Sequence, residues 1–449
     1  MTTRNVLTEG SLFHGILRLA GPLFLGALLT NLQSLIDLFW VGRMGSRAVA
    51  ALALSGTVIM MLFPVIMGMS AGTLALIARA VGSGDRTRAG MVAGQSLGLS
   101  LLVGILSGGA GWVLAPAACR VLGAPEEVVP EAVGYLRIIF LGSFTMVLLF
   151  IATSAMQGAG NTVIPTAVMA LANLLNLVLD PLLIFGLAGL PALGVRGAAL
   201  ATVLSQAAAA VILLVLLYGG KVGLRVRMPQ YRPRPVIWGQ ILRIGVPGMG
   251  QMLSRSLMSL VLMRLVVTGG VAAVAAYGIG LRFHMITLMP AFALANAAAT
   301  MVGQNLGAGN PRRAARAAWL ATTLGMFLLA LSALVLFLGA APLVGFFDPS
   351  PEVQAIGKTY LQIVSPFYVF AAMAIILGRG LMGAGDTVSS MILTILALWG
   401  LQVPLALLLM HLLENPLVGI WVAIAISTTA HGILTALWFQ TGRWKAIRV

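Results

Sequence analysis

The sequence carries very little charge. Charged residues make up 8% of its 449 positions, whereas 60% are hydrophobic and the mean hydropathy is +1.03. A soluble domain carries about 25% charged residues, so this chain has too few polar side chains to cover a water-facing exterior. The composition therefore excludes a soluble globular protein and indicates a protein that is embedded in lipid.

Cysteine and the common enzyme motifs are also scarce. The single cysteine, Cys119, excludes an internal disulfide and a cysteine-based metal site. HExxH does not occur, and the triplet at 357–359 lacks the upstream glycine of a phosphate loop because Glu352 stands there. We therefore expect no enzyme, no cofactor and no resident metal site.

Long apolar runs separated by short polar breaks predict the fold. Because a bilayer core of about 30 Å needs roughly 20 apolar residues per helical crossing, the chain has room for about twelve crossings and no sizeable soluble domain. We therefore predict an all-α membrane protein. The expected helices lie near 15–41, 47–78, 89–118, 130–156, 162–187, 193–218, 238–268, 271–302, 313–340, 353–381, 388–412 and 416–440.

The second half of the sequence repeats the first at a constant offset of 225 residues. The run AVAA at 48–51 recurs at 273–276, and GAG at 158–160 recurs at 383–385. Chance similarity between apolar segments would drift in register, so the offset indicates a duplication. We predict two six-helix lobes related by an axis along the membrane normal, at 1–218 and 238–449, joined by a basic cytoplasmic linker at 219–237.

Basic residues outnumber acidic ones by 27 to 11, which gives a formal net charge of +16. In a soluble protein this excess would suggest nucleic acid as a partner. Here Lys and Arg gather in the breaks on one side of the predicted membrane, which the positive-inside rule identifies as the cytoplasmic side. We therefore predict a multi-pass protein with both termini in the cytoplasm, contact with anionic lipid heads, and no nucleic-acid partner.

Only two acids, Asp37 and Asp180, lie within predicted helices away from their ends. A charge at the bilayer centre costs about 2.5–3.5 kcal/mol on insertion scales, so such acids usually face a cavity and act there. The alternative is that each acid only satisfies helix packing. Polar side chains accompany both acids at helical spacing, so we predict one shared site. They are Gln33 on the first helix, Asn173 and Asn176 on the fifth, and Thr202 on the sixth.

Several segments resemble the multidrug and toxic compound extrusion (MATE) family over essentially the whole chain. They are PLFLGALLTNLQSLIDLFWVG at 22–42, QGAGNT at 157–162, MGAGDT at 382–387 and NLLNLVLDPLLIFG at 173–186.

The resemblance implies an exporter of amphipathic, often cationic compounds that is driven by inward flow of H⁺ or Na⁺. We expect a monomer in a bacterial or archaeal cytoplasmic membrane. By position, Asp37, Asn176 and Asp180 look like the first-lobe cation-coupling site of the branch often described as proton-coupled, with sodium at the same residues as the alternative. Gln33, Asn173 and Thr202 are then expected to contact the cargo.

The second half departs from the sodium-linked branch of that family, because its helices near 238–268 and 353–381 carry no intramembrane acid. They and their neighbour carry basic residues instead, of which Arg255 and Arg282 lie deep. Our hypothesis is that these two arginines bind cargo and favour anionic or zwitterionic compounds. Two alternatives stay open. In one, both arginines cap helix carbonyls or pair with the acids; in the other, the chain is a flippase for lipid-linked metabolites in the same superfamily.

Overall fold

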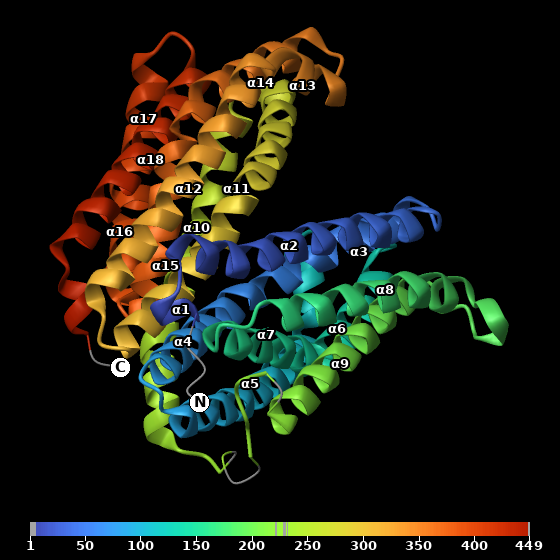
Figure 1. The fold of residues 1–449 in the computed structure, drawn as a ribbon. Coiled ribbons are helices and arrows are strands. Elements are labelled where there is room, and N and C mark those ends of the chain that lie inside the picture. The colour runs from blue at the N-terminus through green and yellow to red at the C-terminus, as the bar shows by residue number, and fades with distance from the viewer. Residues whose placement is uncertain (1–5, 221, 228–229, 231, 448–449) are drawn as a thin grey trace. The chain divides into compact units, whose positions relative to one another are not determined.

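The computed structural model describes residues 6–220, 222–227, 230 and 232–447. Over these residues the chain is built from helices and contains no strand (Figure 1). The prediction of an all-α fold is confirmed.

The first half contains a short helix followed by eight long or medium helices. Their bounds are α1 Val6–Glu9, α2 Leu12–Gly42, α3 Ser46–Ile59, α4 Phe63–Gly82, α5 Arg86–Val121, α6 Val129–Leu141, α7 Ser143–Gly158, α8 Val163–Phe185 and α9 Val195–Gly219.

The second half of the described chain also contains nine α-helices. Its helices are α10 Pro235–Val267, α11 Gly270–Gly307, α12 Pro311–Leu338, α13 Ala340–Phe347, α14 Pro351–Val364, α15 Tyr368–Ala384, α16 Thr387–Ile395, α17 Val403–Leu412 and α18 Pro416–Thr441. A π-helical segment, Leu396–Gln402, joins α16 to α17.

Eleven helical stretches of the described chain are long and apolar enough to cross a membrane, where α3 with α4, α14 with α15, and α16 with α17 each count as one stretch. The number is twelve when the bent pair α6 and α7 is also counted as one span. This confirms the expected number. The pair bends by 48° at Gly142, and the repeat-related position in the second half, Ser365–Phe367, is likewise a break between α14 and α15. The duplication therefore extends from sequence to helix breaks.

The repeat also fixes where helices begin. Asp85 and Asn310, which are 225 residues apart, each accept a hydrogen bond from the backbone N–H three residues on, at 2.8 and 3.2 Å. Asn161 and Asp386 do the same for α8 and α16. Such side chains satisfy N–H groups that a helix start leaves without a partner. Equivalent caps therefore give both halves the same helix register.

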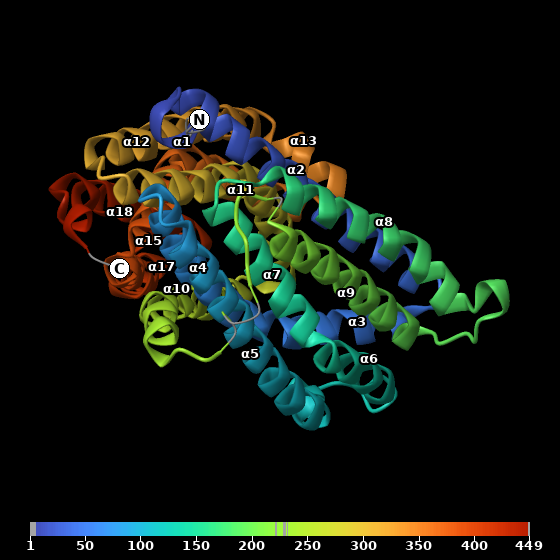
Figure 2. The ribbon, with the colours of Figure 1, turned by 60° about the horizontal axis from the view of Figure 1, so that its bottom comes forward.

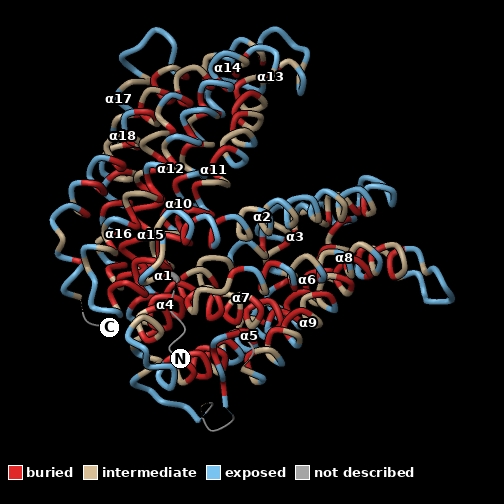
Figure 3. The backbone as a smooth tube through the Cα atoms, viewed as in Figure 1, coloured by how far each residue is buried: buried red, intermediate tan, exposed pale blue. Residues whose placement is uncertain are grey.

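The helices group into two compact units. The N-unit is Gly21–Val246, and the C-unit is Pro247–Val449 together with Met1–Ala20. Both boundaries fall inside a helix, beside the repeat-related prolines Pro22 and Pro247. Within the N-unit α8 and α9 lie side by side in two views (Figures 1 and 2). Buried segments concentrate on α4, α5 and α7 of the N-unit and on α11 and α15 of the C-unit (Figure 3).

The described part of the linker packs on the N-unit. Gln95 of α5 is 1% exposed and donates to the carbonyl oxygens of Gln230 and Arg232 at 2.5 and 2.7 Å. Its own side-chain oxygen accepts from the backbone N–H of Arg234 at 2.8 Å. One buried amide therefore holds the chain that leads into α10.

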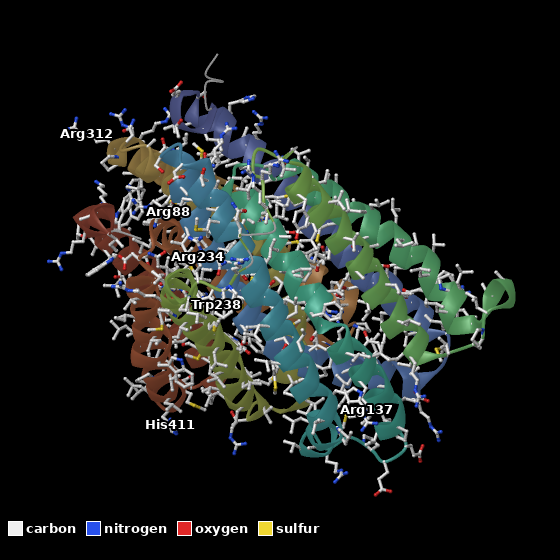
Figure 4. All side chains as sticks on the ribbon, turned by 90° about the horizontal axis from the view of Figure 1, so that it is seen from below. Arg88, Arg137, Arg234, Trp238, Arg312 and His411 are labelled. Atoms are coloured by element: carbon white, nitrogen blue, oxygen red, sulfur yellow. The ribbon has the colours of Figure 1, made fainter. Side chains whose placement is uncertain are left out.

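A contact between α5 and the residue before α10 shows which end of the N-unit carries the linker. The Arg234 guanidinium donates to Met91 Sδ at 3.0 Å, close to Arg88. Figure 4 shows Arg88 and Arg234 toward one end of this unit and Arg137 toward the other. The first two lie in segments predicted to be cytoplasmic, and the orientation in the membrane stays a prediction.

Close packing of α4 on α10 can be tested at a glycine. A Cβ added at Gly72 would lie 2.5 Å from the carbonyl oxygen of Ile241, whereas one added at Gly56 on α3 would meet nothing within 4 Å. We expect Gly72→Ala to lower the stability of the purified protein by about 1–3 kcal/mol through overpacking. Gly56→Ala should be neutral or stabilising, because alanine favours helix over glycine by about 1 kcal/mol. Equal melting temperatures for the two variants in detergent would contradict this packing.

Candidate functional site

The two intramembrane acids lie on α2 and α8 of the N-unit and are linked by amides. Gln33 Nε2 donates to Asn176 Oδ1 at 2.7 Å, and Asn176 Nδ2 donates to Asp180 Oδ1 at 3.3 Å. Gln33 and Asp37 are four residues apart on α2, and Asn176 and Asp180 are four apart on α8, so each pair shares one helix face. We call Gln33, Asp37, Asn176 and Asp180 the acidic cluster.

The carboxyl groups of Asp37 and Asp180 face each other within hydrogen-bonding reach. Asp180 and Asn176 are both 0% exposed. One oxygen of each carboxyl, Asp37 Oδ1 and Asp180 Oδ2, is buried without a hydrogen-bond partner. Two ionised carboxylates have only acceptors to offer, so a proton or a metal cation between them is what the pair lacks.

An apolar cluster one turn beyond the acids holds their helices together. Val41 on α2 and Ile184 on α8 are 0% and 2% exposed and belong to one core with Tyr135 of α6. Each lies four residues after its acid. Packing of these side chains therefore fixes the ends of α2 and α8 and brings the carboxyls together.

Tyr135 is a residue that the sequence did not single out. It is 7% exposed and lies close enough to Asp37 and Asp180 to interact with both charges. A tyrosine in an apolar run gives no signal of such a role. The only sequence signal for Tyr135 is that the repeat has a tyrosine at the equivalent position of the second half, Tyr360.

The other expected N-unit residues are placed less tightly. Asn173 lies one turn before Asn176 on α8, and its side-chain nitrogen is buried without a partner. Thr202 on α9 donates to the carbonyl oxygen of Ala198 in its own helix at 3.0 Å. Neither side chain has a hydrogen bond to the acidic cluster within the described chain, so their contact with cargo stays a prediction.

The oxygen atoms around the two acids bear on which cation the cluster binds. Hard metal cations are held by several oxygen ligands at once. Asn176 Oδ1 already accepts from Gln33, which leaves chiefly the two carboxyls. Among the described residues there is no group of three or more His, Cys, Asp or Glu side chains that could hold a metal. One shared proton would give this pair of acceptors the donor that both need.

A second group of polar residues lies in the C-unit. Arg255 on α10 is close enough to Arg379 on α15 for the two charges to repel. His284 on α11 and His431 on α18 each lie within electrostatic reach of Arg255. We call Arg255, Arg379, His284 and His431 the basic cluster.

Hydrogen bonds tie together the helices that carry the basic cluster. One turn before Arg255, Gln251 Nε2 donates to Ser390 Oγ at 3.0 Å and to Thr394 Oγ1 at 2.8 Å on α16. Thr394 Oγ1 in turn lies 3.4 Å from His431 Nε2. The ring of His284 joins α11 to α15 through its Nδ1, which is 3.1 Å from the hydroxyl of Tyr368. These contacts fix the positions from which the basic side chains extend.

The two arginines that the sequence grouped differ in exposure, Arg255 being half-buried. Arg282 is exposed on α11 and has no hydrogen bond or ion pair with any residue that the structure describes. Arg379 and His431 lie close to Arg255 instead. Sequence spacing could not reveal this, because α10, α15 and α18 are far apart along the chain.

Comparison with known proteins identifies the family. A model of the MatE family matches residues 22–182 and 247–408. A protein of Thermotoga maritima described as "Probable multidrug resistance protein NorM" is 28% identical over 437 residues, covering 96% of this chain and 92% of that protein. The "FAD transporter" of Shewanella oneidensis is 27% identical over 438 residues, covering 96% and 95%.

A solved structure is equally similar over its full length. It is described as "Reverse polarity of binding pocket suggests different function of a MOP superfamily transporter from Pyrococcus furiosus", and it superposes with a TM-score of 0.90 at 27% identity over 98% of both chains. Because the family model matches most of each half and the relatives cover nearly the whole chain, this protein belongs to the MatE family, whose members are membrane transporters and not enzymes.

Proposed function

We propose that the protein exports amphipathic small molecules by alternating access, in exchange for inward flow of a cation at Asp37, Asp180 and Asn176. The observation that carries the proposal is the facing pair of carboxyls, each with a buried oxygen that lacks a partner. The multidrug-resistance names of the relatives support the cargo class. We further propose a monomer in a bacterial or archaeal cytoplasmic membrane with both termini inside.

The coupling follows from the two states of the pair. Without a cation, two buried negative charges repel each other and attract a cationic part of the cargo or water. With one proton, the carboxyls hydrogen-bond to each other and α2 is drawn toward α8. Cargo and proton therefore compete for one site, and a change of access between the two states turns inward proton flow into outward cargo flow.

Removal of either charge should abolish coupling. We expect Asp37→Asn and Asp180→Asn each to lower ethidium efflux at least tenfold, because a neutral amide cannot alternate between repulsion and proton sharing. Glu126→Gln, which changes an exposed acid between α5 and α6, should transport at the wild-type rate. Efflux is measured against a concentration gradient with the purified protein in proteoliposomes. Wild-type rates in both aspartate variants would refute the scheme.

The coupling ion can be determined in the same vesicles. We propose the proton over sodium because Gln33 occupies the Asn176 carbonyl oxygen. Addition of substrate should then change the pH inside vesicles loaded with a pH-sensitive dye, at the same rate in sodium and in potassium buffer. A flux that requires sodium would assign Na⁺ to Asp37, Asn176 and Asp180 and reject the proton.

A second candidate function is the export of anionic or zwitterionic metabolites, free or linked to lipid. Arg255 favours it, because it lies deep in the C-unit beside a second arginine and has no ion pair with a described acid. The name of the Shewanella oneidensis relative, a transporter of the anionic compound FAD, points the same way.

Matched cationic and anionic dyes test the charge of the cargo. If the arginines bind cargo, Arg255→Ala and Arg282→Ala should each lower transport of the anionic dye and leave that of the cationic dye unchanged, since only the anion loses a counter-charge. Arg264→Ala, at an exposed position of α10, serves as the control. Unchanged dye preference in both Arg255→Ala and Arg282→Ala would remove this function.

A further inference from the structure

The C-unit has a group of like charges without a counter-ion. Ser390 of α16 connects the helices that carry Arg255 and Arg379. Its Oγ accepts from Gln251, one turn before Arg255, at 3.0 Å, and a Cβ added at Gly378, next to Arg379, would lie 3.2 Å from the same atom. The two arginines are close enough for their charges to repel, and neither has an ion pair or a hydrogen bond with a residue that the structure describes. Two guanidinium groups in low-dielectric surroundings are unfavourable unless something of opposite charge joins them. The question is what supplies that charge.

The acids of the described C-unit do not supply it. Asp386 caps α16 through the backbone N–H of Ser389 and also accepts from Trp438 Nε1 at 3.2 Å, so both of its oxygens are engaged. The remaining acids lie in the N-terminal segment, in the connection from α13 to the first turn of α14, and in the loop from α17 to α18. They are Glu9, Asp348, Glu352 and Glu414.

The repeat places Arg255 and His431 on the counterparts of α2 and α9, whereas Arg379 and His284 correspond to Ser154 and Ile59, outside the acidic cluster. Subtracting 225 places Arg255 at Thr30 and His431 at Gln206, both on the polar edges of α2 and α9. Tyr360 corresponds in the repeat to Tyr135, the tyrosine beside the two acids. Its hydroxyl is within hydrogen-bonding reach of Tyr368, whose own hydroxyl contacts His284. The same frame therefore presents acids in the N-unit and bases in the C-unit.

The geometry points to a binding site for a phosphate group, and we propose that Arg255 and Arg379 bind it with His431 as a further donor. Two arginines carry two positive charges and a set of planar donors that match tetrahedral oxyanions, whereas a single carboxylate would balance only one. Thr394, fully buried between Gln251 and His431, holds the imidazole in place. A phosphate monoester or pyrophosphate on a soluble metabolite or on a lipid has this chemistry.

This inference rests on the second proposed function, the export of anionic cargo, and gives its cargo a chemical class and a site. It differs from the earlier expectation in pairing Arg255 with Arg379 and not with Arg282. Binding can be measured without an ion gradient, so its outcome does not depend on whether the acidic cluster couples to protons.

The test is calorimetric titration of the full-length purified protein in detergent with AMP, with adenosine as the probe that lacks a phosphate. AMP should bind and adenosine should not. Arg255→Gln and Arg379→Gln should each weaken AMP binding about tenfold or more, as expected for the loss of a charge-assisted hydrogen bond. Arg264→Gln, nine residues along α10 and exposed, should change it less than twofold.

A second probe separates the two sources of phosphate. Short-chain phosphatidic acid is compared with short-chain phosphatidylcholine, which has the same tails and a zwitterionic head. Binding of phosphatidic acid but not AMP, lost in the arginine variants, would support the same site with a lipid as its ligand. Absence of binding by both probes, or binding that is equal in wild type, Arg255→Gln and Arg379→Gln, would overturn the proposal.

Two further variants keep the test valid if the glutamine variants do not fold. Arg255→Lys retains the charge but cannot form two parallel hydrogen bonds, so AMP binding should still weaken severalfold. His431→Gln should weaken it less than either arginine variant, and His411→Gln, at an exposed histidine that hydrogen-bonds to the Leu407 carbonyl oxygen, should have no effect. Wild-type affinity in Arg255→Lys and His431→Gln together would also reject the site.

Discussion

Like charges that are buried together need a partner of opposite charge, and both units of this protein contain such a group. At 4 Å, two unit charges interact by about 4 kcal/mol at an effective dielectric constant of 20, compared with about 1 kcal/mol in water. The acid pair on α2 and α8 and the arginine pair on α10 and α15 therefore each favour binding of a counter-ion. The described chain does not pair these groups internally, and both proposed binding sites rest on this observation.

Apolar packing makes the acid pair effective. Val41 and Ile184 hold the ends of α2 and α8 in one core, so repulsion between the two charged carboxyls acts on the helix pair as a whole. In the proposed cycle a proton, the cargo or a rearrangement of that pair relieves the repulsion. Tyr135 in the same core places a third polar group beside the carboxyls. In the proposed cycle, a change in the charge of the two acids is converted into a change of conformation because the helices that carry them are packed in one core.

The membrane spans, the duplication and the pair of acids could be predicted from the sequence, because the lipid environment restricts both backbone structure and the placement of charge. Lipid forces every backbone group into a helix, so apolar length alone predicts the spans, and the constant offset of 225 predicts equivalent caps and breaks. Asp37 and Asp180 were predictable as a pair because acids in lipid are rare. Arg379 and His431 were not, since only the packing of the helices that carry them brings them to Arg255. Hydropathy does not encode which faces of distant helices meet.

Opposite charge in the two halves has an energetic consequence for anionic cargo. In a cycle that imports one proton and exports a dianion, every transferred charge moves with the inside-negative membrane potential. Each contributes about 2.3 kcal/mol per 100 mV, so three charges supply roughly 7 kcal/mol at that potential. A monovalent cation exported for one proton would gain nothing from the potential. For the anionic cargo of the second candidate function, the membrane potential and the proton gradient would therefore act in the same direction.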